Sequence, residues 1–93
     1  MKDLALSDFA GSEGTAYEVA AEGESVALVL ESATELPSSP RPEGGFRLSF
    51  RGPAEPLLPQ GIYPFRAAGL ACEIFVVPIA CDADGAIYEA IFN

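Results

Sequence analysis

Residues 46–51, FRLSFR, constrain the fold of this chain most strongly, because apolar and polar side chains alternate there without interruption. Side chains two residues apart lie on the same face of an extended strand. A period of two is therefore typical of a half-buried β-strand. The run predicts a strand that turns Phe46, Leu48 and Phe50 toward a core and Arg47, Ser49 and Arg51 toward solvent.

Shorter runs of the same kind predict five further strands, at 15–21, 25–35, 62–67, 70–79 and 86–92. Turn-forming residues separate them, above all the proline-rich and glycine-rich stretches 36–45 and 52–61. Only residues 4–11 favour a helical turn, with Ser7 as its cap. We expect one all-β domain over residues 1–93, with about six antiparallel strands in a meander. They would form a small barrel or a half-open sandwich after a short N-terminal helical turn.

The segment Asp82-Ala83-Asp84-Gly85 has two interpretations. A calcium loop begins with alternating acids, but it needs its glycine at the sixth position and a bidentate glutamate at the twelfth. Here the glycine is at the fourth position, which suits a type I turn followed by a left-handed glycine, with the Asp82 carboxylate accepting a backbone N–H. We therefore predict a hairpin turn, and no metal and no cofactor.

The charge balance limits the classes of partner. Acidic residues outnumber basic ones by 14 to 5 among the 93 residues, which gives a formal net charge of −9. Nucleic acids and anionic membranes bind clustered cations, so we expect neither as a partner. No apolar run approaches the roughly 20 residues of a membrane helix, and the start of the chain lacks the basic region of a secretory signal. These features predict a soluble, cytoplasmic protein.

The residue types of common catalytic sites are scarce. The chain has no histidine, which removes the usual general base and the Ser-His and Cys-His pairs. Its single lysine is Lys2. A disulfide between Cys72 and Cys81 would need a sharp reversal of the chain, so both are expected to be buried apolar thiols. We therefore expect a protein that is not an enzyme.

Arginines in the middle of the chain suggest one polar site. Arg47 and Arg51 share the outer face of their strand, and Arg66 would join them if its strand were the neighbour. The three would then form a shallow anion patch. The alternative is that they pair with Glu31 and Glu18 across strands, as surface charges commonly do.

The last predicted hairpin is apolar on both faces. Its inward set is predicted to be Cys72, Ile74, Val76, Tyr88, Ala90 and Phe92. The opposite face would then carry Phe75, Val77, Ile79, Ile87 and Ile91. An isolated small barrel should be polar on its outside, so something is expected to cover this second face. Two candidates stay open: the N-terminal segment with Leu4, Leu6 and Phe9, or an interface with another protein or a second copy of the chain.

Several motifs resemble a family of short uncharacterised bacterial proteins. They are FRGP at 50–53, LPQGIY at 58–63, VP at 77–78 and DADGAIYEAIFN at 82–93, with a looser match in LSDF at 6–9. The resemblance implies a cytoplasmic-type β protein without an assigned activity, in a family with some members associated with phage-tail-collar-like proteins. It implies no catalytic residue. Cys81 and the loop at 36–45 differ from the family pattern.

Two functional hypotheses follow. The first is a non-enzymatic structural or protein-interaction module, in a phage-tail-like or other assembly context. The second is a small-molecule-binding β-barrel, whose cavity would be lined by Tyr17, Phe46, Phe50, Tyr63 and Phe65. Six short strands leave little room for a ligand beside these rings, which favours the first.

Overall fold

A computed structural model describes residues 6–9, 11–36, 45–55, 57–67 and 69–92. A short 3-10 helix, η1, precedes six strands. They are η1 (Leu6–Asp8), β1 (Ala16–Ala21), β2 (Glu24–Leu36), β3 (Gly45–Gly52), β4 (Gly61–Ala67), β5 (Leu70–Asp82) and β6 (Gly85–Phe92). The all-β prediction and its short N-terminal helical turn are confirmed. Most of the predicted loop at 36–45 lies outside the described residues.

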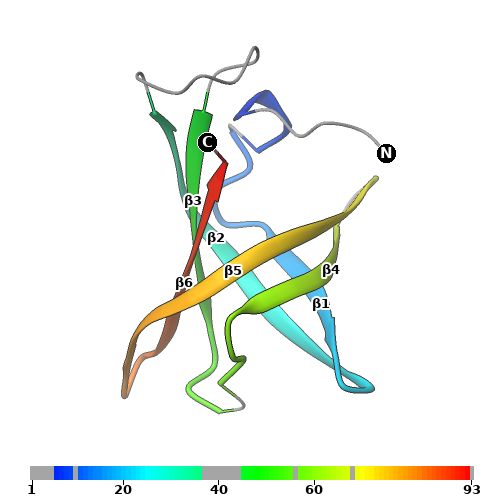
Figure 1. Cartoon of the computed structure of the whole chain (residues 1–93), viewed down its shortest axis with the longest axis vertical. Helices are drawn as coiled ribbons and strands as arrows, with labels where there is room; N and C mark the ends of the chain where they lie inside the picture. Colours follow the sequence, from blue (N-terminus) through cyan, green and yellow to red (C-terminus); the bar gives the residue numbers. More distant parts are fainter. Residues whose placement is uncertain (1–5, 10, 37–44, 56, 68, 93) are drawn as a thin grey trace.

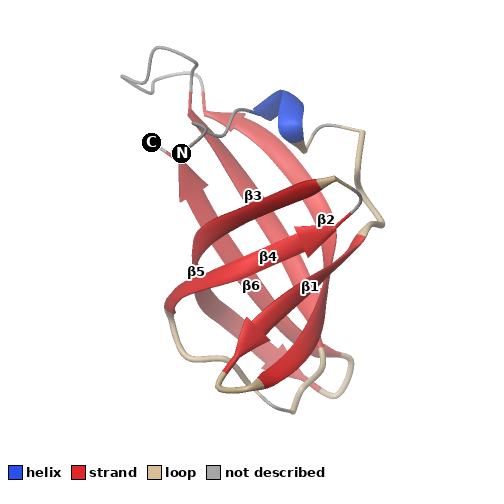
Figure 2. Cartoon of the chain, turned by 90° about the vertical axis from the view of Figure 1, so that its right-hand side faces the viewer, coloured by secondary structure: helices blue, strands red, loops and turns tan. Residues whose placement is uncertain are grey.

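The strands form a closed barrel in the order β1-β2-β3-β6-β5-β4, and every neighbouring pair is antiparallel. Figures 1 and 2 show two meanders of three strands, β1-β2-β3 and β4-β5-β6, that face each other and share their edges. The ring thus resembles a meander except that β3 does not pair with β4. Closure decides between the two predicted forms in favour of the barrel.

Pairing is uneven around the ring. β3 and β6 are paired over seven consecutive positions, from Phe46↔Phe92 to Gly52↔Ala86. β1 and β4 share only two, Glu18↔Arg66 and Val19↔Phe65. Pro64 comes just before these two paired residues of β4, outside the pairing with β1, and a strand tolerates a residue without an N–H at such a place. The β1–β4 seam is therefore the least bonded junction of the barrel.

Alternating side chains of all six strands fill the interior. The described buried set is Phe9, Tyr17, Val19, Val26, Leu28, Leu30, Phe46, Leu48, Phe50, Leu58, Phe65, Ile74, Val76, Ala86, Tyr88 and Ala90. Three ring contacts span the middle: Tyr17–Phe50 at 5.7 Å, Phe50–Phe65 at 5.1 Å and Tyr17–Phe65 at 6.2 Å between centroids. The inward face predicted for β3 is confirmed, because Phe46, Leu48 and Phe50 are all fully buried.

Phe9 closes one end of the barrel. Figure 1 shows η1 at the end where β2 and β3 project beyond β1 and β4. The Phe9 ring, fully buried, lies 5.9 Å from Phe46, 6.3 Å from Tyr17 and 6.5 Å from Phe92 between centroids. Packing of such a ring against three others excludes water from this end of the core.

The position of Phe9 corrects one sequence-based alternative. Phe9 packs with the core and Leu6 packs against it, so these two side chains do not lie across the outer face of the β5–β6 hairpin. The reason is that β2 and β3 project beyond β1 and β4 at this end and leave apolar inner side chains such as Phe46 for the N-terminal segment to cover. Leu4, the third residue of that alternative, lies outside the described residues.

Candidate functional site

The β5–β6 turn is a structural turn. The Asp84 N–H donates to the Asp82 carboxylate over 2.8 Å, and Gly85 has a φ of +123°. This confirms the turn interpretation of residues 82–85, including the role predicted for Asp82. Within the part of the chain that the structure describes, no three acidic or cysteine side chains are grouped as metal ligands would be.

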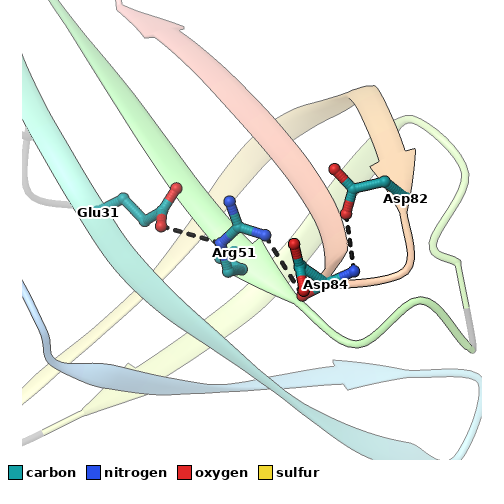
Figure 3. A network of polar contacts seen from close by, with 4 residues as sticks. All are labelled: Glu31, Arg51, Asp82 and Asp84. Carbon is teal, nitrogen blue, oxygen red and sulfur yellow. Dashed lines mark hydrogen bonds and ion pairs between the residues drawn. The ribbon is translucent and has the colours of Figure 1, made fainter.

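This turn is packed tightly against β3. A Cβ added to Gly85 would collide with the carbonyl oxygen of Gly52. Arg51 donates from its terminal nitrogen to the Asp84 carbonyl oxygen over 3.3 Å and from Nε to Glu31 over 2.9 Å (Figure 3). Arg51 thus links β2, β3 and the β5–β6 turn, and it is held in place by its neighbours.

The predicted anion patch is not formed. Arg66 lies on β4, and two strands separate β4 from β3 on either path around the ring. The prediction failed because it assumed that consecutive strands are neighbours, whereas β3 pairs with β6. Arg47 and Arg51 do share the outer face of β3, but Arg66 lies on the other meander.

Each of these arginines already has a carboxylate partner. The ion pairs are Arg47–Glu89 at 2.7 Å, Arg51–Glu31 at 2.9 Å and Arg66–Glu18 at 2.8 Å. The last two are the cross-strand pairs predicted as the alternative. The hydrogen bond that Arg51 donates to the Glu31 carboxylate raises the pKa of Arg51 above its ordinary value. A guanidinium paired in this way is a weak site for a further anion.

The predicted apolar outer set is only partly exposed. Phe75, Ile79 and Ile91 are 50%, 48% and 47% exposed, whereas Val77 and Ile87 are half-buried. The set is also interrupted. Ile91 lies opposite Arg47, and Glu89, the partner of Arg47, lies between Ile91 and Ile87 on the same face.

Among the described large apolar side chains, the one with the highest exposed fraction was not identified from the sequence. Ile62 is 65% exposed and lies directly opposite Phe75, across β4 and β5. Val77 continues this face two residues along β5. We call Ile62, Phe75 and Val77 the β4–β5 strip. The predicted hairpin of 62–67 with 70–79 already indicated this pair, because a two-residue turn at Ala68-Gly69 sets a register in which Ile62 lies opposite Phe75.

The cysteines differ from each other. Both are free; Cys72 is half-buried and Cys81 is exposed. Burial, and after it the nearby Asp8, raises the pKa of the Cys72 thiol. The expectation of two buried thiols was wrong for Cys81, because β5 continues beyond a bulge between Pro78 and Ala80 into an exposed end.

The described concavities lie away from the barrel centre. None of them is lined by Phe46, Phe50 or Phe65, three of the rings expected around a ligand cavity. These rings pack against one another or their neighbours, so the interior holds its own side chains. The best-walled hollow, of about 280 Å³, lies between the β1–β2 turn and residues 57–59.

These features define a class: a small closed barrel of six antiparallel strands, with ion-paired arginines on β3 and an apolar strip on β4 and β5. The chain belongs to the family described as domain of unknown function DUF6916, whose model matches residues 4–92. No curated protein and no solved structure matches it. Among the described residues, no helix has the length and apolar character needed to cross a membrane.

Proposed function

We propose that the chain is a non-enzymatic protein-interaction module that binds another protein through the β4–β5 strip. The observation that carries the proposal is the exposed pair of Ile62 and Phe75, which face each other on the outside of a barrel whose interior is already filled. Exposed apolar groups that adjoin one another commonly mark interaction sites. The absence of histidine from the chain supports a non-enzymatic role.

Charge favours a basic partner over a second copy. The chain carries a formal net charge of −9, and its three described arginines each pair with a glutamate. Two copies would repel each other, whereas a partner with clustered lysine or arginine would be attracted. The exposed carboxylate Glu73 lies on the same face of β5, two residues before Phe75.

The size of the strip leads to the same choice. Full burial of three such side chains contributes roughly 1.5–3 kcal/mol each, and less where the side chain is already half-buried. Association costs about 4–15 kcal/mol. Burial of the strip therefore leaves little surplus over this cost, to which a basic partner adds attraction and a second acidic copy adds repulsion. The resemblance noted in the sequence supports an assembly context of phage-tail-like type.

Site-specific photocrosslinking in the native host tests the proposal. A benzoyl-phenylalanine at position 75 is expected to give one adduct with a second protein, and the double variant Ile62→Ser, Val77→Ser with the same crosslinker is expected to lose it. The matched control places the crosslinker at position 91. Ile91 is exposed to a similar extent as Phe75, but it lies opposite Arg47 where β3 pairs with β6.

Three outcomes would overturn it. No adduct at position 75, or adducts of equal yield at 75 and 91, would remove the strip as the specific surface. An adduct of two copies would replace the partner by self-association. Light scattering of the purified chain is expected to give the monomer mass of 9.7 kDa.

A further inference from the structure

A small hollow lies at β4, beside Tyr63, which packs against the core on the opposite face of this strand from Ile62. It has a volume of about 280 Å³ and lies between the β1–β2 turn, residues 57–59 and Tyr63. Tyr63 follows Ile62 directly in β4, so the hollow and the strip share one strand. The hollow lies next to the short β1–β4 seam, at the part of β4 that precedes the two residues paired with β1.

The walls of the hollow are apolar and held in place. Val26 and Leu58 line it and are almost fully buried, so they form its floor. The Leu58 N–H donates to the Tyr88 hydroxyl over 2.8 Å, which anchors this segment to the core. The Tyr63 hydroxyl donates to the Pro59 carbonyl oxygen over 2.6 Å, which fixes the ring that forms one wall.

Two carboxylates line the same hollow. Glu22 and Glu24 come from the β1–β2 turn, and neither makes an ion pair with the described residues. Glu22 has a φ of +50°, in the left-handed region that residues other than glycine rarely adopt. Partial burial, and after it the charge of Glu22, raises the pKa of Tyr63, so this carboxylate acts close to the ring.

We infer that this hollow receives an arginine side chain of the partner protein. The aliphatic stem of the arginine would pack on Val26 and Leu58, and its guanidinium would lie against the Tyr63 ring and pair with Glu22 and Glu24. A planar guanidinium suits this arrangement better than an ammonium, because it stacks on aromatic faces and binds carboxylates through two N–H groups at once.

The dimensions agree with a single side chain. The hollow is just smaller than the range of about 300–1,000 Å³ typical of small-molecule sites. An arginine seated beside an apolar strip is the usual composition of an interaction hot spot. The inference rests on the proposed function, since it names the group by which the same partner is held.

A titration with N-acetyl-arginine N-methylamide, followed by amide NMR shifts, tests the inference without the partner. Shifts are expected at 21–26 and 57–63, with a dissociation constant on the order of 1 mM. Glu22→Gln and Glu24→Gln should each weaken binding about two- to fivefold. Glu35→Gln, which changes an exposed carboxylate at the opposite end of β2 from Glu24, is the matched control and should leave the affinity unchanged.

The neutral citrulline analogue of the probe separates charge from shape. It is expected to give no saturable shifts in these segments. Equal shifts with both probes, or equal weakening by Glu22→Gln and Glu35→Gln, would overturn the inference. Absence of any adduct at position 75 in the chain that keeps Ile62 and Val77 would instead overturn the proposed function, so the two failures are distinguishable.

Discussion

The outer faces of β3 and of the β4–β5 hairpin differ, although both cover the same core. On β3 the outward residues are Arg47, Ser49 and Arg51, and both arginines are paired with glutamates of neighbouring strands. On β4 and β5 Ile62 lies opposite Phe75, and both are at least half exposed. Both regions bury their inward side chains in the same core. The apolar exterior of β4 and β5 therefore has no explanation in the folding of the barrel alone, and this contrast is the observation on which the proposed binding rests.

The largest expected difference between the two regions is the cost of removing a phenyl ring. Phe50 is fully buried and contacts Tyr17 and Phe65, so Phe50→Ala should cost about 3–5 kcal/mol of unfolding free energy. Phe75→Ala removes an exposed ring and should cost less than about 1 kcal/mol. Urea denaturation of both variants measures the difference. Equal costs would mean that the β4–β5 strip supports the fold.

Turn glycines give the second comparison. Gly85 and Gly69 both have positive φ, +123° and +85°, but only Gly85 lies against another backbone, that of Gly52 on β3. Gly85→Ala should therefore cost more than the roughly 1–3 kcal/mol of backbone strain alone. Gly69→Ala, with open space around it, serves as the control and carries the strain alone. Thermal unfolding in parallel measures both, and equal shifts in Tm would contradict the close contact between β3 and the β5–β6 turn.

The sequence predicted local structure better than it predicted the order of the strands. Alternation predicted the strands well, because side-chain period depends on local backbone geometry: residues 46–51 were expected as a half-buried strand and lie within β3. The turn at 82–85 was also predictable, since Asp82 and Gly85 act on their own segment. Strand order was not, because the partner of β3 is β6, a distant segment whose choice depends on barrel closure.

The candidate site was harder to predict than the fold. Arg66 was assigned to the wrong neighbours for this reason. Ile62 was overlooked although the predicted hairpin of 62–67 with 70–79 already paired it with Phe75. The hollow at Tyr63 joins residues 21–26 to residues 57–63, which are distant in sequence. Such a contact appears only when the ring of strands is closed.

A smaller difference is expected for the arginines. Arg51 bonds to Glu31 and to the Asp84 carbonyl oxygen, whereas Arg66 has, among the residues that the structure describes, only its exposed pair with Glu18. Arg51→Met should lower Tm slightly and Arg66→Met should leave it unchanged, because an isolated surface pair contributes little. Repeating the melts at 1 M salt is expected to shrink the Arg51 effect. A larger loss from Arg66→Met would contradict the view that β3 holds the better-ordered surface.

The smallest effect concerns no stability at all and probes how tightly the β5 side of the interior is closed. Cys72 faces inward opposite Phe65 and is half-buried, and Cys81 is exposed near the end of the same strand. Because burial and Asp8 raise the pKa of Cys72, less of it is thiolate at a given pH, and the thiolate is the form that reacts. Iodoacetamide should therefore modify Cys81 first. In the Cys81→Ser variant, the rate of Cys72 alkylation should rise at a higher pH than it does for an unperturbed thiol. Equally fast modification of both cysteines would show that η1 and Phe9 open readily. The interior beside β5 would then be more accessible to solvent than the interior beside β3.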